Sequence, residues 1–304
     1  IYALIVAILI IFVLAISQDK QGNILATVSK TSAKIANGKD VRINDFIIRM
    51  DPEKGEILQE WDLVHMLDSA RYGMTDYNLT ADPYAQNASN WAHNNGIVEW
   101  GNNYLATARY QGIFKFNKAG GIEWIISPHG YWRDRYLKLL LNPLHADGTP
   151  ITDPDVIAGT KNCDDFEWPW GCHTAVPLPN GHIFYFNNGY GRNFKLDFTD
   201  RKNVYTCGIE YEVDEVNRTV RQVWQYGKER GTAYFTPARS GVQYLEQTGN
   251  RLICPGMSNV LSNGNRGARV TEVDPETQEI VFELELEDAI YQRVYRMSLY
   301  PDNQ

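Results

Sequence analysis

A pattern of strands and hairpins recurs four times along this chain of 304 residues, and it constrains the fold more than any single motif does. Each unit opens with a glycine turn, continues with apolar strands and ends in a hairpin that leads into a charged or tryptophan-bearing strand. The opening turns are Gln21-Gly22-Asn23, Trp100-Gly101-Asn102, Pro179-Asn180-Gly181 and Thr248-Gly249-Asn250. The closing strands read EILQEWDL, GIEWIIS, TVRQVWQY and EIVFELEL. Alternating apolar residues between turns rich in Asp, Asn, Gly and Pro predict antiparallel hairpins.

Two histidines occupy matching places in the second and third units. His93 and His173 each lie eight residues before the opening glycine, Gly101 or Gly181. Two imidazoles at one position of a repeated unit should point to one shared place in the fold. Histidine is also the side chain best suited to proton transfer or nucleophilic attack near neutral pH. A lone histidine beside a tryptophan is more often structural, so it is the repetition that favours a functional role.

Repeated units of roughly four strands predict a β-propeller with antiparallel four-stranded blades. A β-sandwich with long loops is the alternative, and it explains the hairpins but not the repeated histidine offset. Four blades are few for a closed ring, and an open ring would expose sheet edges, which proteins usually avoid. The first unit also lacks a recognisable inner strand, unless residues 1–17 supply it. We therefore expect an N-terminally incomplete propeller over residues 18–304, with an insertion at 129–168 that holds a short helix.

Arginines follow both histidines in the pattern. The innermost strands of a propeller line a central channel, so His93 and His173 should lie at one channel mouth. Arg109 and Arg192 end the next strand of the same two units. Two arginines beside two histidines would hold a tetrahedral or planar oxyanion through forked hydrogen bonds. The segment YGKER at 226–230 adds a cationic cluster, for which a solvated loop end is the alternative.

Other chemistry has weaker support in the sequence. Two histidines with carboxylates can bind a divalent ion, but no HxH or HExxH spacing is present, so we expect no metal and no cofactor. The G-x-S-x-G elbow of a serine hydrolase is also missing from the sequence. Four histidines have no counterpart in the repeat and are assigned structural roles: His65, His129, His145 and His182.

The composition limits which partners the protein can bind and bears on the cellular compartment in which it folds. The 8 Trp, 18 Tyr and 11 Phe, together with 24 Gly, favour strands and tight turns over helices. A formal net charge of -8 argues against a nucleic-acid partner, because phosphate binding needs a basic face. Cys163 and Cys172 flank an aromatic loop and are placed to close a small disulfide in an exported chain, with buried free thiols as the alternative.

Residues 1–17, IYALIVAILIIFVLAIS, carry no charge. Such a run is typical of the core of a signal peptide, or of a membrane anchor slightly short of a full span. We therefore expect an exported protein that is periplasmic, extracellular or membrane-anchored. The alternative is that residues 9–17 form a strand that is buried on both faces.

Several segments resemble, in the same order, the arylsulfate sulfotransferase family of bacteria. They are NWAHNNGIVE, YLATARYQGIFKF, EWPWGCHTAVPLPNGHIFYFNNGYGR, TVRQVWQYGKERGTAYFTP and the closing YRMSLYP. The resemblance implies a periplasmic or secreted six-bladed propeller, and it does not reach the family's N-terminal sandwich domain or first blades. In that family a sulfuryl group passes from a phenolic sulfate ester to an active-site histidine and then to a second phenol, without a nucleotide donor.

The resemblance also implies roles for individual residues. His93, His173 and Arg192 match active-site positions of the family, where such groups would stabilise the sulfuryl oxygens and the departing phenolate. Substrate contacts are expected from Asn95, Arg109, Tyr226, Lys228 and Arg230. The chain is thus predicted to be a nucleotide-independent sulfotransferase that acts on small phenolic sulfates and phenols.

One position departs from the family pattern. The sulfuryl-accepting histidine of the family lies in a glycine-rich segment after the YGKER motif, in a later blade. Here that region reads LICPGMSN over residues 252–259, and no histidine follows His182. Asn259 stands where the nucleophile is expected, and an amide cannot form the covalent intermediate. Either His173 or His93 takes this role, or transfer is direct, or the chain is a non-catalytic propeller that binds aromatic or sulfated ligands.

Overall fold

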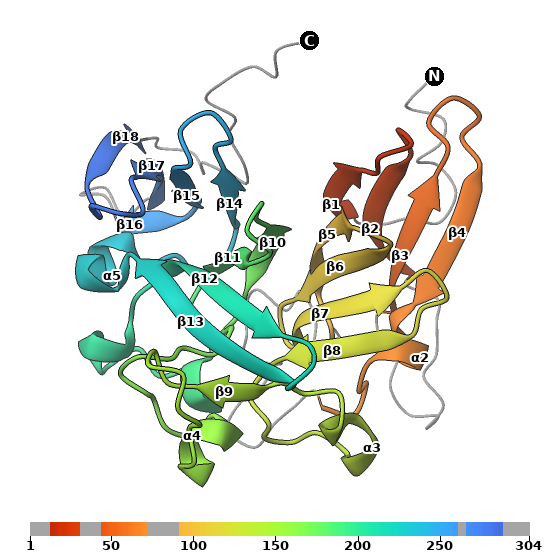
Figure 1. The fold of residues 1–304 in the computed structure, drawn as a ribbon. Helices are drawn as coiled ribbons and strands as arrows, with labels where there is room; N and C mark the ends of the chain where they lie inside the picture. The colour runs from red at the N-terminus through yellow and green to blue at the C-terminus, as the bar shows by residue number, and fades with distance from the viewer. Residues whose placement is uncertain (1–12, 31–43, 72–90, 261–265, 288–304) are drawn as a thin grey trace. The chain divides into compact units, whose positions relative to one another are not determined.

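The computed structural model describes residues 13–30, 44–71, 91–260 and 266–287. Within these residues the regular secondary structure is mainly β-strand, arranged as four antiparallel sheets (Figure 1). The described helices are short: α2 (Leu63–Met66), α3 (Asp134–Leu137), α4 (Pro154–Ala158) and α5 (Gly231–Tyr234), with 3₁₀ turns at Arg192–Phe194, Arg201–Asn203 and Lys228–Arg230. The predicted all-β class is confirmed, and the insertion at 129–168 holds two short helices rather than one.

The four sheets follow the four units of the sequence. The first contains β1 (Val13–Gln18), β2 (Ile24–Lys30), β3 (Asn44–Met50) and β4 (Ile57–Asp62), in that order. The second contains β5 (Asn94–Trp100), β6 (Asn103–Ala108), β7 (Gly112–Asn117) and β8 (Ile122–Ile126). The third contains β10 (His173–Pro177), β11 (Ile183–Asn187), β12 (Cys207–Asp214) and β13 (Thr219–Tyr226), with β9 (Asn142–Leu144) added beside β13. In the fourth, β14 (Ser240–Tyr244), β15 (Arg251–Pro255) and β17 (Arg266–Val273) lie in order, and both β16 (Ser258–Val260) and β18 (Ile280–Leu286) pair with β17.

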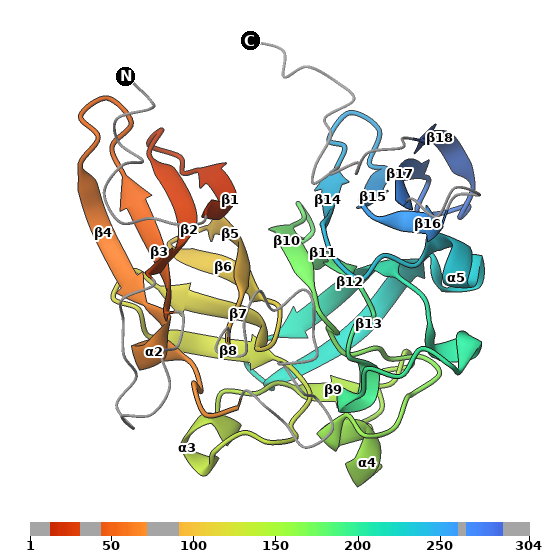
Figure 2. The ribbon, with the colours of Figure 1, turned by 180° about the vertical axis from the view of Figure 1, so that it is seen from behind.

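The chain divides into two compact units, each with two sheets. The first unit contains the residues up to 142, with 152–162 and 193–196, and the second contains 143–151, 163–192 and the residues from 197 onward. The insertion at 129–168 therefore contributes to both units. Within each unit the first strands of the two sheets are neighbours: β1 lies beside β5, and β10 lies beside β14 (Figure 1 and Figure 2). In the first unit the Ser17 hydroxyl donates to the carbonyl of Ile97 across this contact at 2.7 Å.

The repeated turns have a local cause. The four opening glycines, Gly22, Gly101, Gly181 and Gly249, have φ angles of 84°, 63°, 86° and 78°. Only glycine adopts this left-handed region without a steric cost. In each later hairpin an Asp or Asn side chain accepts hydrogen bonds from backbone N–H groups two to four residues ahead; these are Asp51, Asn117, Asp214 and Asp274. The predicted hairpins are thus confirmed together with their turn chemistry.

A tryptophan joins the two sheets of each unit. Trp61 on β4 donates through Nε1 to the carbonyl of Lys118, and Trp224 on β13 donates in the same way to the carbonyl of Pro275. The two distances are 3.0 Å and 3.1 Å, and both carbonyls belong to the hairpin turn of the following sheet. The repeat in the sequence is therefore also a repeat of sheet-to-sheet packing.

The described end of the apolar segment forms β1 and supplies the strand that the first unit lacked. Over residues 15–17, the part of the proposed segment 9–17 whose burial is described, the strand is not buried on both faces. Side chains alternate along it, with Ala15 and Ser17 half-buried and Ile16 62% exposed. Residues 1–12 lie outside the described residues, and export or anchoring stays a prediction. Of the helices that are described, none combines the length and the apolar character that a membrane span requires.

Candidate functional site

The first unit brings His93, Asn95 and Arg109 together at the start of β5 and the end of β6. The backbone N–H of Arg109 donates to the carbonyl of His93 at 3.0 Å, and the Thr107 hydroxyl donates to Asn95 Oδ1 at 2.8 Å. His93 and Arg109 are buried. The ring of Tyr110 lies 6.0 Å from the imidazole of His93 and 5.7 Å from the guanidinium carbon of Arg109. The strand pairing therefore gathers these predicted residues at one edge.

Asp45 on β3 fixes the backbone that carries His93. His93 has a φ of 52°, in the left-handed region that a non-glycine residue keeps only when its neighbours compensate the strain. Asp45 Oδ2 accepts the backbone N–H of Asn94 at 3.0 Å, and the Ser29 hydroxyl donates to Oδ1 at 2.6 Å. Burial of the carboxyl group raises the pKa of Asp45 from 3.8 to about 6. The buried carboxyl group of Asp45 thus stabilises the backbone conformation beside His93.

The carboxyl group of Asp45 should make stability depend on pH. Because its pKa is higher in the folded chain than in the unfolded chain, the folded chain holds the proton more tightly. The contribution of Asp45 to the free energy of unfolding is therefore largest below about pH 4. It falls by about 3 kcal/mol as the pH rises to about 6. Asp45→Asn should remove this decline. Urea unfolding of both proteins between about pH 4 and 7 measures the difference, and parallel pH profiles would contradict it.

In the second unit, His173 opens β10 and is held by an amide group. Its Nδ1 lies 2.7 Å from Asn188 Oδ1. The Nδ2 group of Asn188 donates to the carbonyl of Thr236 and to the Ser240 hydroxyl, both at 2.8 Å. These two acceptors orient the amide so that its oxygen faces the imidazole. Nδ1 of His173 therefore carries the proton, and the lone pair of the neutral ring is on Nε2.

Thr236 connects this support to the strand that contains Asn259. The carbonyl of Thr236 accepts from Asn188, and its hydroxyl oxygen accepts the backbone N–H of Met257 at 3.0 Å. β16 begins at the next residue, and Asn259 falls where its pairing with β17 shifts register. Such a bulge changes the local direction of a strand. One hydrogen-bonded path thus runs from His173 to the segment that holds Asn259.

Arg192 is buried beside Glu167 and Tyr205. Its Nη1 pairs with the carboxylate of Glu167, its Nε donates to the carbonyl of Asn203 at 3.2 Å, and its Cζ lies 4.0 Å from the centre of the Tyr205 ring. The third nitrogen, Nη2, is buried and has no hydrogen-bond partner among the described residues. A buried donor without a partner costs free energy, and a bound anion would satisfy it.

The charged residues of the segment YGKER lie in two different surroundings within the same unit. Lys228 Nζ lies 5.5 Å from the centre of the Tyr205 ring, which also faces Arg192. Arg230 instead pairs with Glu283 at 2.9 Å and 3.0 Å and donates to the Tyr226 hydroxyl at 3.0 Å. Lys228 therefore lies beside the same ring as Arg192, whereas Arg230 links Tyr226 on β13 of the third sheet to Glu283 on β18 of the fourth. Substrate contact by these three residues stays a prediction.

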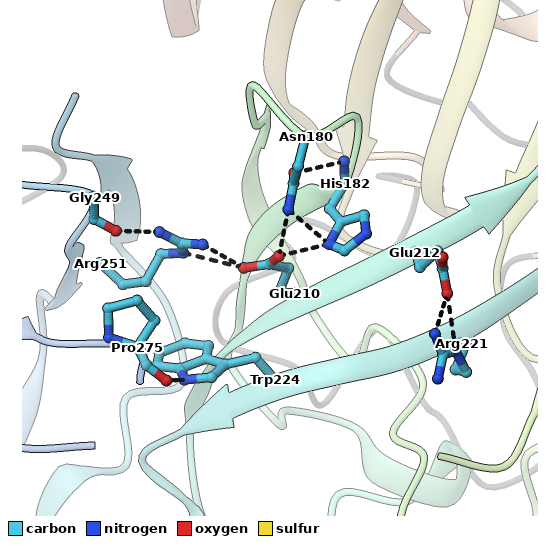
Figure 3. Close-up of polar contacts among 9 residues, drawn as sticks. All are labelled: Asn180, His182, Glu210, Glu212, Arg221, Trp224, Gly249, Arg251 and Pro275. Carbon is cyan, nitrogen blue, oxygen red and sulfur yellow. Dashed lines mark hydrogen bonds and ion pairs between the residues drawn. The ribbon is translucent and has the colours of Figure 1, made fainter. Parts of the chain in front are cut away.

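A polar network around Glu210 explains the position of His182 (Figure 3). Arg251 on β15 donates to one carboxylate oxygen of Glu210 on β12 at 2.6 Å and 3.1 Å. His182 Nδ1 lies 2.7 Å from the other oxygen, and the Asn180 amide lies 3.4 Å from it. The side chains of Arg251 and Glu210 are 8% and 6% exposed. The network ties β12 and the turn between β10 and β11 in the third sheet to β15 of the fourth.

Removing one member of the buried Arg251–Glu210 pair should be costly. Arg251→Met leaves the Glu210 carboxylate in a buried place without its cation, and we expect a loss of about 3–5 kcal/mol of unfolding free energy. Adding Glu210→Gln removes the isolated charge and should recover part of the loss. Urea unfolding of both variants measures the two values. A loss below about 1 kcal/mol for Arg251→Met would place this pair with weak surface ion pairs.

Sequence reasoning missed the residues that brace the two histidines. Asn188 lies in the segment NNGYGR, which ends at Arg192. Gly189 in the same segment has a φ of 67°, and a Cβ atom there would collide with the carbonyl of Tyr205. The Asn188-Gly189 pair is the feature of the sequence that could have indicated a tight turn beside His173. Asp45 and Thr236 reach their histidines through long-range contacts that no local pattern reveals.

All four cysteines are free thiols in the structure, so of the two states that the sequence leaves open for Cys163 and Cys172 the structure shows the free thiols and no disulfide. Cys172 is fully buried, and the Cys163 thiol donates to Asp165 Oδ1 at 3.1 Å. Burial raises the pKa of Cys207 to about 12. A thiol with so high a pKa is a poor nucleophile at neutral pH.

These features define an all-β protein of repeated antiparallel sheets that buries a histidine and an arginine in each of its two units. The chain belongs to the arylsulfotransferase (ASST) family, whose model matches residues 12–296. It is 28% identical over 317 residues to the arylsulfate sulfotransferase AssT of Escherichia coli O6:H1, which covers 94% of this chain and 52% of that relative. The AssT of Lelliottia amnigena is 28% identical over 313 residues, which covers 93% of this chain and 52% of the relative. The chain thus spans about half the length of the curated relatives it matches.

A solved structure shows a more distant likeness. A protein of unknown function from Bacteroides caccae aligns with a TM-score of 0.45 and 10% identity, over 90% of this chain and 66% of that one. A likeness at this level carries no inference about function.

Proposed function

We propose that the chain transfers a sulfuryl group from an aryl sulfate ester to a phenolic acceptor, without a nucleotide donor. Its family membership and the names of its relatives support this substrate class. The observation that carries the proposal is the hydrogen bond between His173 Nδ1 and Asn188, because it leaves the nucleophilic lone pair on Nε2. The unpartnered Nη2 of Arg192 supplies a second group of the right kind, a cationic donor for sulfuryl oxygens.

In the proposed mechanism His173 divides the transfer into two steps. The Nε2 lone pair attacks the sulfur of the donor, the S–O bond to the aryl group breaks, and the phenolate leaves with that electron pair. The acceptor oxygen then attacks the same sulfur, the N–S bond breaks, and its electrons return to Nε2. The acceptor proton passes to the released phenolate. Throughout, Asn188 accepts the Nδ1 hydrogen bond and stabilises the positive charge on the ring, while Arg192 stabilises the sulfuryl oxygens.

The proposal extends to the arrangement of the sheets. We propose that the repeated four-stranded sheets are blades of a propeller. The repeated sheet order and the neighbouring first strands within each unit support this arrangement. Substrate contacts are then proposed for Asn95, Arg109, Tyr226, Lys228 and Arg230. A role for His93 in the reaction predicts that His93→Ala lowers turnover as His173→Ala does.

The test is incubation with 4-nitrophenyl sulfate and a phenol acceptor. Release of nitrophenolate that depends on the acceptor, and that falls in the His173→Ala variant, would support the proposal. Formation of the sulfated acceptor, measured by mass spectrometry, distinguishes transfer from hydrolysis. Equal release by wild type and His173→Ala would exclude His173 as the nucleophile.

A non-catalytic propeller is the second candidate. The observation that favours it is Asn259, which stands where the resemblance places the sulfuryl-accepting histidine. Such a protein would bind aromatic or sulfated ligands without turning them over. Binding of 4-nitrophenyl sulfate by calorimetry, with no nitrophenolate released, would favour this candidate over the enzyme.

Export is proposed on the apolar run at residues 1–17. An exported or anchored protein would be recovered outside the cytoplasm when cells that make the full-length precursor are fractionated. Recovery in the cytoplasmic fraction alone would argue against this localisation.

A further inference from the structure

Three potential metal ligands meet in two loops of the second unit. His145 follows β9, and Cys163 and Asp165 lie 18 and 20 residues further along the chain. One ligand atom from each side chain lies within 4.8 Å of the other two. His145 Nδ1 is 3.0 Å from Asp165 Oδ1, and Cys163 Sγ is 3.1 Å from the same oxygen. The spacing matches no metal-binding motif, so only the fold brings these residues together.

The backbone holds the two loops in place around the cluster. A tight turn closes between His145 and Thr149, whose backbones share a hydrogen bond of 2.8 Å. The N–H of Ala146 donates to Asp165 Oδ2 at 2.9 Å, which joins this turn to the second loop. Arg221 on β13 donates to the carbonyl of Ala146 at 3.0 Å. The turn that carries His145 and the carboxylate of Asp165 are thus held by contacts other than those among the three side chains, as a preformed metal site requires.

The donor set selects the kind of metal. One imidazole nitrogen, one thiolate sulfur and one carboxylate oxygen are typical ligands of Zn²⁺, whereas Mg²⁺ and Ca²⁺ prefer oxygen alone. A thiolate and a carboxylate together balance the charge of a divalent ion. The half-buried side chains also leave solvent access for water as a fourth ligand.

We propose that His145, Cys163 and Asp165 bind one Zn²⁺ ion, with water in the fourth position. Binding replaces the proton of the Cys163 thiol, which is released to solvent, and the hydrogen bonds among the three side chains give way to bonds to the metal. The ion would fasten the turn at 145–149 to the loop at 163–165. The proposal is independent of sulfuryl transfer, because it uses none of the residues assigned to that reaction.

The test is titration of the metal-free, reduced full-length chain with Co²⁺, which reports its ligands by absorption. A thiolate-to-cobalt charge-transfer band is expected in the wild type and should disappear when Zn²⁺ displaces the cobalt. Cys163→Ser should abolish the band, and Asp165→Asn should lower Zn²⁺ affinity at least about 100-fold in competition with a chromophoric chelator. Asp164→Asn is the matched control, since Asp164 is adjacent and exposed but lies outside the cluster.

Distinct results would overturn the proposal. Wild type without a charge-transfer band, or with a band that persists in Cys163→Ser, would show that this thiol is no ligand. Equal Zn²⁺ affinities for Asp165→Asn and Asp164→Asn would remove the carboxylate from the site. Because the wild-type spectrum is itself decisive, the test does not depend on the folding of any variant. Circular dichroism of each variant confirms that the sheets are intact.

Discussion

Replacing His173 with alanine is expected to lower kcat/KM for 4-nitrophenyl sulfate by about 10²–10⁴-fold, the range for a positioned acid, base or nucleophile. The reason is the fixed tautomer, since Nδ1 is bonded to Asn188 and the reactive lone pair is on Nε2. The wild type should also form a sulfuryl-enzyme when donor is supplied without acceptor. Mass spectrometry of the intact chain would detect this adduct, and His173→Ala should lack it.

Two further variants separate a chemical role from a structural one. Asn188→Asp keeps an acceptor for Nδ1 but adds negative charge, so it should raise the pKa of His173 and move the acidic limb of the pH–rate profile upward. A residue with only a packing role would change stability and leave that profile in place. His65→Ala is the matched control, because this histidine is 83% exposed and pairs only weakly with Asp62 at 3.8 Å. Loss of activity in His65→Ala would point to a general effect of histidine removal.

The fold was predictable where its causes are local. The turn at Gly22 needs a positive φ, and the hairpin at Asp51 needs a side chain that accepts nearby N–H groups, so both leave marks in the sequence. Trp224 packs against the next hairpin as Trp61 does. A tryptophan that recurs at the same place in the repeat is stronger evidence for such packing than a single tryptophan would be. By contrast, burial along β1 could not be derived from hydrophobicity, because Ile16 is apolar and yet exposed.

The candidate site was only partly predictable. His93 and His173 were found because a repeat placed them at one offset, but their braces come from elsewhere in the chain. Asp45 reaches the backbone beside His93 from another sheet, and Thr236 reaches the support of His173 from a connecting loop. Such hydrogen bonds depend on which segments pack together, and a single sequence carries no record of that. His145 shows the same limit, since its position beside Cys163 and Asp165 appears only in the fold.

Asn259→His is expected to raise sulfuryl transfer by about 10²-fold, the lower end of what a positioned nucleophile or acid–base group contributes. The residue lies in β16, in a segment tied to His173 through Thr236 and Asn188. An imidazole there would supply the nucleophile that the resemblance places at this position, and His173 would then support the reaction. The gain should be visible as a faster burst of nitrophenolate release in stopped-flow measurements.

The double variant decides which histidine carries the sulfuryl group. If the introduced imidazole becomes the nucleophile, Asn259→His should restore a sulfuryl-enzyme even with His173→Ala, although turnover stays below that of Asn259→His alone. If His173 remains the nucleophile, the double variant should be as inactive as His173→Ala. Asn217→His is the control, since it makes the same exchange at an exposed hairpin tip. An equal gain from Asn217→His would mean that the effect does not depend on position 259, and the assignment of that position as a lost nucleophile would fail.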